Sequence, residues 1–326
     1  MSRLRVAVIC GGRSGEHEIS LRSAESVIAA MDSDRYEVRR ILITKEGRWQ
    51  PGPILPEPGA NPGIDVVFPV LHGTFGEDGT IQGLLELAAL PYVGAGVLAS
   101  SVSMDKEVMK RLCMERGLPV TEYLVARRGQ FRREDICGRM PYPLFVKPAN
   151  LGSSVGISKV KACEDLSAAL EIAAQYDRKI LVERAIEGRE FECSVMGNDE
   201  PMAAVPCEIL PSREFYDYED KYLLNQAQTV LPADLTEEQM REMRRLAVAC
   251  YQAVECEGMA RVDFLRETAT GNLYINEINT VPGFTSISMF PKMWEAAGIP
   301  YPKLIDRLIE LALERHRERQ ATRYER

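Results

Sequence analysis

Two acidic residues and an amide lie at matching positions on the arms of a predicted hairpin near the C-terminus. Asp263 follows Arg261 by two positions on the first arm, and Asn279 follows Glu277 by two positions on the second. Because residues i and i+2 of a strand share a face, we expect Asp263, Glu277 and Asn279 to face one another across the hairpin. Neighbouring carboxylates repel unless a cation lies between them, and oxygen ligands suit magnesium. The alternative is an exposed hairpin whose acidic residues are simply solvated.

A glycine- and serine-rich segment, VKPANLGSSVGISKV, lies in the middle of the chain between two predicted strands. Backbone N–H groups around Gly152, Ser154 and Gly156 can turn toward a phosphate, and Lys147 supplies a positive charge. The order differs from that of a P-loop, in which the lysine directly follows the glycines. We expect a flexible hairpin that closes over phosphates, and a simple turn of small residues is the alternative.

A competing pattern follows the short predicted strand at Tyr92. Gly94, Gly96 and Ala99 match the weaker G-x-G-x-x-A form of the dinucleotide fingerprint. The strand and acidic residue expected further along are missing, because residues 105–116 have a helical pattern. A nicotinamide-dependent dehydrogenase is therefore kept as the alternative function, and an ATP-binding regulatory module without chemistry is a third.

The chain has few residues that could serve in histidine-dependent or nucleophilic catalysis. His72 lies in a glycine-rich turn after a predicted strand, where α/β folds bind ligands, and we assign it a site role. His17 lies in a similar turn and is given no role. The sequence has no GxSxG motif and no cysteine in a nucleophile context, so hydrolase chemistry is unsupported.

The elements that must position these residues fall into two kinds. Strand 4–10, a glycine turn and a helix begin an alternation that continues with strands 36–44 and 64–70 and a helix over 80–90. This alternation predicts an α/β domain with a doubly wound, mostly parallel sheet, ending near Ser100. The rest has α+β character, with helices predicted at 105–117, 165–176, 237–256 and from about Pro302, and strands at 120–126, 143–147, 157–160, 180–184, 190–197, 202–209, 259–266 and 272–279.

The segment 211–227, PSREFYDYEDKYLLNQA, is long, aromatic and charged without a clear period. Loops of this length in compact domains are usually functional or disordered. We expect a loop that covers the substrate, because its aromatic side chains are costly to expose, and disorder is the alternative.

Composition narrows the partners. The chain has 326 residues, is 45% hydrophobic and 27% charged, and carries a formal net charge of -8. An acidic chain with both signs interspersed argues against nucleic acid or an anionic membrane as the main partner. The eight cysteines show no CxxC pair and are expected to be small buried hydrophobes. No signal peptide or membrane span is predicted, so we expect a protein of a reducing, cytoplasmic compartment.

Several motifs in this order resemble one family along nearly the whole chain. The motifs are GGRSGEHEIS, LHGTFGEDGTIQG, SMDK, KPANLGSSVG, LVERAIEGREF, YDYEDKY and RVDF with NEINTVPGFTSISMFP. Together they resemble the D-alanine:D-alanine ligases of the ATP-grasp superfamily. The resemblance implies three domains, at 1–100, 101–188 and 189–326, with ATP between the last two, and it suggests a homodimer.

The resemblance also implies roles for individual residues. Two magnesium ions, for which manganese is a possible substitute, would be held by Asp263, Glu277 and Asn279. ATP would be bound by Lys106, Lys147, Ser154, Glu183, Ala185, Ile186 and Glu190. The first D-alanine would meet Glu16, in a network with Ser153 and Tyr222, and His72. The second would meet Lys221 and Ser288, while Arg261 and the Gly283 N–H would face the developing oxyanion.

The implied reaction phosphorylates one carboxylate with ATP and joins it to the amine of a second amino acid, for peptidoglycan precursor synthesis. The base for the amine stays open. Asn150-Leu151 stands where relatives often have a charged pair, which leaves the closing contacts of that loop in question. The YDYEDKY loop resembles that of enzymes that add alanine, so a D-alanyl-D-lactate product is disfavoured.

Overall fold

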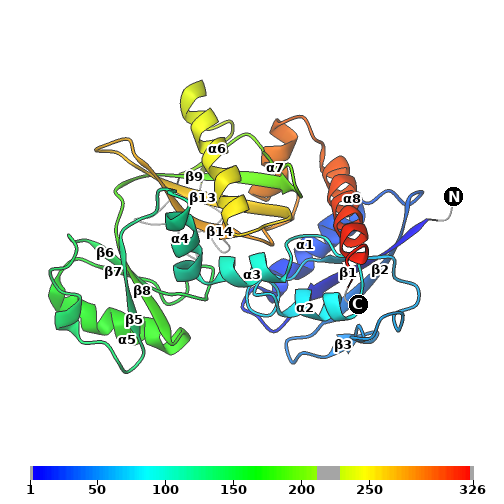
Figure 1. Ribbon diagram of the computed structural model, residues 1–326, viewed down its shortest axis with the longest axis horizontal. Coiled ribbons are helices and arrows are strands. Elements are labelled where there is room, and N and C mark those ends of the chain that lie inside the picture. Colours follow the sequence, from blue (N-terminus) through cyan, green and yellow to red (C-terminus); the bar gives the residue numbers. More distant parts are fainter. Residues whose placement is uncertain (1–2, 211–227, 324–326) are drawn as a thin grey trace.

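Three β-sheets form the framework of the computed structural model, which describes residues 3–210 and 228–323 (Figure 1). The first sheet contains β1 (Leu4–Gly11), β2 (Tyr36–Ile43), β3 (Trp49–Gln50) and β4 (Val66–Pro69), in the order β3-β2-β1-β4. β2 and β4 run parallel to β1, and only β3 is antiparallel to its neighbour. The predicted mostly parallel sheet is therefore confirmed. The predicted substrate-covering loop at 211–227 lies outside the described residues.

The first sheet is built on the apolar run of β1, where Val6 to Cys10 are all buried. A strand that is apolar on both faces needs cover on both faces. Part of that cover comes from α1 (His17–Ala30), which packs on β1. Another part comes from α2 (Thr80–Leu87), whose Ile81 and Leu85 share an apolar core with Ile9 of β1. A third helix, α3 (Val97–Met104), leads out of this part of the molecule.

The second sheet is antiparallel throughout and has the order β5-β8-β6-β7. Its strands are β5 (Tyr123–Arg127), β6 (Leu144–Pro148), β7 (Ser158–Val160) and β8 (Lys179–Arg184). The helix α5 (Leu166–Tyr176) packs on this sheet. Two short 3-10 turns complete the region: η1 (Arg133–Asp135) lies between β5 and β6, and η2 (Cys163–Asp165) lies directly before α5. The helix α4 (Lys106–Glu115) precedes the sheet and is capped by Asp105, whose side chain accepts a hydrogen bond from the Val108 N–H.

The third sheet supplies the other half of the α+β part. It consists of β9 (Gly188–Gly197), β10 (Met202–Ala203), β11 (Cys207–Leu210), β12 (Gln228–Val230), β13 (Gly258–Glu267) and β14 (Leu273–Asn279). The helix α6 (Glu237–Ala253) packs on it and begins with a capping box between Thr236 and Gln239. Two further helices, α7 (Met289–Ala296) and α8 (Tyr301–Gln320), end the described chain.

The last helix packs against the N-terminal part of the chain. α8 lies beside the first sheet (Figure 1), and one apolar core contains Val8 and Phe68 of that sheet together with Leu308 of α8. The basic and charged composition of residues 315–326 predicts a solvated helix end, and for Arg315 this prediction is wrong. Its side chain is buried and donates hydrogen bonds to the carbonyl groups of Tyr92 and Gly94.

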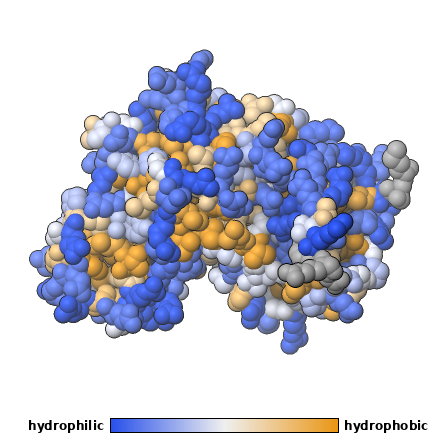
Figure 2. Space-filling model, viewed as in Figure 1, coloured by the Kyte–Doolittle hydropathy of each residue, from blue (hydrophilic) through white to orange (hydrophobic). Residues whose placement is uncertain are grey.

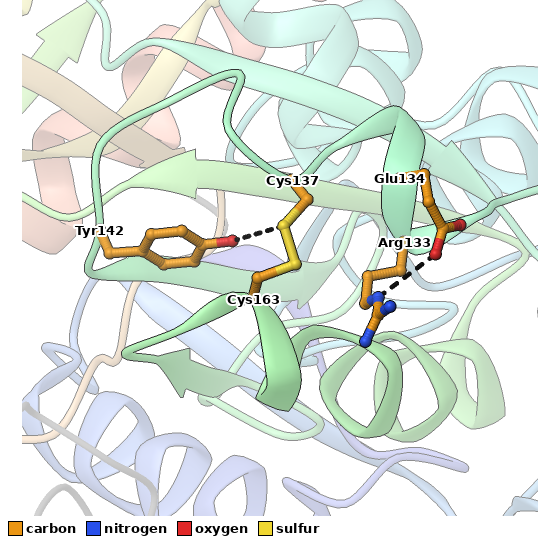
Figure 3. The surroundings of a disulfide bond; sticks show 5 residues. All are labelled: Arg133, Glu134, Cys137, Tyr142 and Cys163. Carbon is orange, nitrogen blue, oxygen red and sulfur yellow. Dashed lines mark hydrogen bonds and ion pairs between the residues drawn. A yellow bond between two sulfur atoms is a disulfide. The ribbon is translucent and has the colours of Figure 1, made fainter.

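Two of the eight cysteines differ from the prediction that all are small buried hydrophobes. Cys137 and Cys163 form a disulfide with their Cα atoms 5.6 Å apart, and the Tyr142 hydroxyl lies 3.7 Å from the Cys137 sulfur (Figure 3). The two residues are 26 positions apart and come together only through the fold of the second sheet. The other six cysteines are free and buried, as predicted.

The surface in Figure 2 is hydrophilic at its outer ends and indented along its lower edge, between the lobe of the second sheet and that of the first. Apolar residues gather in the middle of this face, next to the indentation. Within residues 3–210 and 228–323, no helix has the length and apolar character needed to cross a bilayer.

Candidate active site

A cavity lies between the second and third sheets. One wall comes from β6, β8 and the glycine-rich segment, and the other from β9, β13 and β14. Its lining includes many of the residues selected from the sequence: Lys106, Lys147, Ser153, Ser154, Glu183, Ile186, Glu190, Asp263 and Glu277. The residues predicted to hold phosphate thus surround one space with two of the three predicted metal ligands, while the third, Asn279, is not part of the lining.

The two carboxylates of the hairpin are direct neighbours. Asp263 pairs with Glu277 across the β13–β14 ladder, and Arg261 pairs with Asn279. The Asn279 amide donates a 3.1 Å hydrogen bond to Asp263. Among the described residues, no group of three or more His, Cys, Asp or Glu gathers as a metal site, but this hairpin offers two carboxylates and an amide. Oxygen donors of this number fit magnesium, which keeps several ligands from water and phosphate.

Arg261 holds one of these carboxylates in place. Its guanidinium donates two 2.7 Å hydrogen bonds to Asp263, and it also lies 3.4 Å from Glu192. Burial would lower the pKa of Arg261, but the two carboxylates outweigh burial and hold that pKa well above its usual value. A permanently charged, bidentate partner fixes the orientation of Asp263.

A β-bulge brings an additional residue to the site. Asp263 pairs with Glu277 and Phe264 pairs with Ile275, so Asn276 is the extra residue on β14. Adjacent residues of a regular strand face opposite ways, yet Asn276 and Glu277 both line the cavity. Regular strand alternation predicts that Asn276 faces away from Glu277, so the sequence did not indicate Asn276 as a site residue.

The two predicted phosphate-binding lysines both line the cavity. Lys106, at the start of α4, lies 3.2 Å from Glu277 and donates a 3.0 Å hydrogen bond to the Leu151 carbonyl. Lys147, on β6, lies 3.4 Å from the amide oxygen of Asn276. Both ammonium groups therefore stand next to the carboxylate hairpin, where a polyphosphate would need positive charge.

The glycine-rich segment forms the turn between β6 and β7. Ser153 and Ser154 both adopt left-handed backbone conformations, with φ of 56° and 59°. Residues other than glycine rarely adopt this backbone conformation, and those that do are concentrated at ligand-binding sites. The Ser153 hydroxyl donates a 2.6 Å hydrogen bond to Glu16, which precedes α1 of the first sheet. Gly73 permits this approach, because a Cβ atom there would lie 2.8 Å from a Glu16 carboxylate oxygen.

His72 connects the first sheet to the end of the hairpin. It is buried, with Nδ1 3.0 Å from the Val281 carbonyl oxygen and Nε2 3.3 Å from the Ser23 hydroxyl. Burial alone would lower the pKa of His72, but the carboxylates of Glu77 and Glu16 outweigh it and raise that pKa above its ordinary value. Glu77, 3.7 Å from Nδ1, was not selected from the sequence.

The two remaining described substrate residues follow the hairpin. Gly283 and Ser288 approach each other closely, since a Cβ atom at Gly283 would lie 3.2 Å from the Ser288 hydroxyl. Ser288 precedes α7, and its hydroxyl lies 2.8 Å from that of Thr285. The other two predicted residues, Lys221 and Tyr222, lie outside the described residues.

The predicted adenine end of the cavity is formed at the end of β8. Glu183 is 4% exposed, and Ile186 and Glu190 line the cavity. Ala185 differs from the others, because its N–H donates to the Pro143 carbonyl and the residue is not part of the lining. Only the carbonyl group of Ala185 can therefore serve a ligand, while Arg184, which was not predicted, does line the cavity.

A fully buried lysine beneath this end was also missed. Lys110 lies 3.1 Å from Glu183, which Lys147 approaches to 2.5 Å from the other side. The spacing offered a signal, since Lys110 is four residues after Lys106 and residues at i and i+4 share a face of a helix.

The glycine turn that suggested a dinucleotide site is covered by the protein itself. The carbonyl of Gly94 accepts a hydrogen bond from Arg315 of α8, and a Cβ atom at Gly258 would lie 2.8 Å from the same carbonyl oxygen. A pyrophosphate needs an approach to the backbone of such a turn. The dehydrogenase alternative is therefore unsupported at this turn.

Comparisons with known proteins agree with the ligase reading. The family model described as "D-ala D-ala ligase C-terminus" matches residues 112–310, and "D-ala D-ala ligase N-terminus" matches residues 5–58 and 55–95. A D-alanine--D-alanine ligase of Solibacter usitatus (strain Ellin6076) is 67% identical over 324 residues, which cover 99% of this chain and 100% of the relative.

Two solved structures share the fold. The D-alanine-D-alanine ligase from Coxiella burnetii superposes with a TM-score of 0.87 at 38% identity, covering 98% of this chain and 97% of that one. The VanG D-Ala:D-Ser ligase from Enterococcus faecalis gives a TM-score of 0.87 at 35% identity, covering 95% and 100%. These matches confirm the ATP-grasp fold class. They leave the dehydrogenase alternative without support, and the chain belongs to the D-alanine–D-alanine ligase family of ATP-dependent ligases.

Proposed function

We propose that this chain joins two molecules of D-alanine through an acyl phosphate in the cavity between the second and third sheets. The observation that carries this assignment is the meeting of three features there. A carboxylate hairpin (Asp263, Glu277), two lysines (Lys106, Lys147) and a glycine-rich turn surround one space. The membership of the ligase family supports the same reaction.

In the first step, a carboxylate oxygen of the first D-alanine attacks the γ-phosphorus of ATP. The bond between this phosphorus and the bridging β,γ oxygen breaks, and ADP leaves. Lys106 and Lys147 neutralise charge on the phosphates, and backbone N–H groups of the turn at Ser154 orient them. A carboxylate is a poor electrophile, so phosphorylation supplies the leaving group that the next step needs.

The oxygen ligands Asp263, Glu277 and Asn279 suit two magnesium ions, with manganese as a possible substitute. Bound there, the ions would offset negative charge on the transferring phosphoryl group. Arg261 holds Asp263 oriented for this task through its two 2.7 Å hydrogen bonds.

In the second step, the amine of the second D-alanine attacks the acyl carbon, loses a proton and expels inorganic phosphate. Arg261 and the N–H of Gly283 are proposed to face the oxyanion, where preorganised donors stabilise the transition state. Closure of the glycine-rich turn onto Glu16 through Ser153 would limit hydrolysis of the acyl phosphate by water.

The amino acids are assigned to the junction of the first sheet with the hairpin end. Glu16 would bind the ammonium group of the first D-alanine, with Ser153 and Tyr222 in its network and His72 near the carboxylate. Ser288 and Lys221 would bind the carboxylate of the second. At the nucleotide, Glu183 and the backbone at Ala185 and Ile186 would contact adenine, and Glu190 the ribose.

We further infer domain limits at 1–100, 101–188 and 189–326. The shared core of α8 and the first sheet argues that α8 also packs as part of the first domain. A homodimer is inferred from the family resemblance, and its mass in solution can be measured by light scattering. The use of ATP as substrate supports a cytoplasmic location, for synthesis of peptidoglycan precursors.

The reaction is tested with D-alanine labelled with 18O in its carboxylate. An acyl phosphate mechanism requires transfer of one labelled oxygen to inorganic phosphate, together with ADP release that depends on both D-alanine and a divalent ion. Unlabelled phosphate would rule out carboxylate activation. Repeating the assay with L-alanine, D-serine and D-lactate as the second substrate defines the acceptor.

A further inference from the structure

One carboxylate in the cavity wall is held between two lysines. The Glu183 carboxylate on β8 has one oxygen 3.1 Å from Lys110 on α4 and the other 2.5 Å from Lys147 on β6. The Lys110 ammonium also donates a 2.9 Å hydrogen bond to the Thr121 hydroxyl. Lys110 has 0% of its surface exposed, so its charge is neutralised only by what it touches inside the protein.

The two lysines differ in what they can reach. Lys147 lines the cavity and also lies 3.4 Å from Asn276, next to the carboxylate hairpin. Lys110 is not part of the lining, because it lies behind Glu183 and Thr121, which are. Lys147 can therefore turn to a bound polyphosphate, whereas Lys110 has no path to a ligand.

The electrostatics of Glu183 depend on both partners. Burial would raise the pKa of Glu183, but the charges of Lys110 and Lys147 outweigh burial and hold that pKa below its usual range. If Lys147 leaves to neutralise phosphate, a buried carboxylate with no other cation would be strongly disfavoured. Lys110 remains beside it in either position of Lys147.

We propose that Lys110 is a positioning residue: it is the fixed counter-ion that holds the Glu183 carboxylate oriented toward the nucleotide base while Lys147 serves the phosphates. This inference rests on the proposed function, in which Glu183 accepts a hydrogen bond from the adenine amino group. An acceptor held at this place favours a base that carries an amino group there over one that carries a carbonyl oxygen.

The test is Lys110→Met, which keeps an unbranched stem of the same length and removes the charged ammonium group. The KM for ATP should rise by roughly 10-fold or more, the range expected when a hydrogen bond to a charged group is lost. The preference for ATP over GTP should narrow, and the KM for D-alanine should stay within about twofold of wild type, because binding at the Glu16 end does not involve Glu183. If Lys110 only supported the fold, Lys110→Met would raise the KM for ATP and the KM for D-alanine by similar factors.

Arg111→Met is the matched control, since it removes one positive charge from the same helix at an exposed position. Wild-type kinetics are expected for it. An unchanged KM for ATP in Lys110→Met, at wild-type ATP preference, would overturn the proposal.

A second comparison decides the matter even if Lys110→Met does not fold. Glu183→Gln removes the charge that Lys110 serves, and Lys110→Met/Glu183→Gln removes both charges and so keeps the net charge of the cluster. The KM for ATP of the double variant should equal that of Glu183→Gln, because no carboxylate remains to be held. A further loss of about fivefold or more would overturn the proposal. Wild-type protein without D-alanine-dependent ADP release would instead contradict the proposed function itself.

Discussion

The hydroxyl of Ser153 donates a 2.6 Å hydrogen bond to the carboxylate of Glu16, although the two residues are 137 positions apart. Ser153 lies in the turn between β6 and β7, and Glu16 lies directly before α1. This one contact therefore joins the glycine-rich turn to the first sheet at the edge of the cavity. The turn is held closed toward the place where an amino acid is proposed to bind.

Ser153→Ala should weaken this closure. We expect kcat/KM for D-alanine to fall by roughly 10- to 100-fold, since a hydrogen bond to a charged group contributes about 1.5–3 kcal/mol. The KM for ATP should change much less. Steady-state ADP release with each substrate varied in turn measures both effects. Ser158→Ala, on β7 just beyond the turn, is the control, and equal kinetics for the two variants would show that the contact does not matter.

Asp263→Asn and Glu277→Gln should each abolish most ADP formation. Each variant keeps the shape of the side chain and removes one negative charge from the proposed cation site, where a bound metal provides several kcal/mol of transition-state stabilisation. We expect kcat to fall by at least about 100-fold and the concentration of magnesium needed for half activity to rise. Asp135→Asn, an exposed carboxylate in the second sheet region, should behave as wild type. Full activity without Asp263 would remove the hairpin from the mechanism.

Local periodicity explains which site residues could be selected from the sequence. Asp263, Glu277 and Asn279 share a face because alternation along a strand is a local rule, and the structure does bring them together. Asn276 escaped because the β-bulge that turns it inward depends on the pairing with β13. Lys110 could have been selected from the sequence, because it lies one helical turn after Lys106. Its role, however, depends on the contact with Glu183, which lies on a strand far away in the sequence.

The same distinction applies to the fold. The alternating elements of the first sheet were correctly predicted, because each is marked by its own apolar period. The packing of α8 against that sheet was not, since it depends on contacts between the two ends of the chain. Arg315 has the composition of a surface residue and is buried only because the Tyr92 and Gly94 carbonyls lie beside it.

His72 and His316 should titrate in a defined order. The pKa of His72 is raised above its ordinary value of 6.5, since Glu77 and Glu16 outweigh burial, while burial lowers the pKa of His316 below the same value. Nuclear magnetic resonance titration of the ring protons, assigned with His72→Gln, should place His72 above His316. The reverse order would contradict the buried carboxylate network around His72.

The raised pKa of His72 also has a consequence for stability. The folded state binds this proton more tightly than the unfolded state, so the contribution is fully present below about pH 6.5 and is lost as pH rises through the folded pKa. The difference in unfolding free energy between wild type and His72→Gln should therefore shrink as pH increases above that value. Urea unfolding at a series of pH values measures it, and a difference that grows with pH would show the opposite sign.

The disulfide between Cys137 and Cys163 should lower the number of free thiols and stabilise the fold. Denatured protein should expose six thiols before reduction and eight after it, because six cysteines are free. The bridge spans 26 residues, so the loop-closure model predicts that reduction lowers the free energy of unfolding by about 3–4 kcal/mol. Cys137→Ser/Cys163→Ser should be insensitive to reductant, which separates the bridge from effects on the buried thiols. Eight thiols in denatured protein that was never reduced would contradict the bridge, and would fit the rarity of disulfides in reducing compartments.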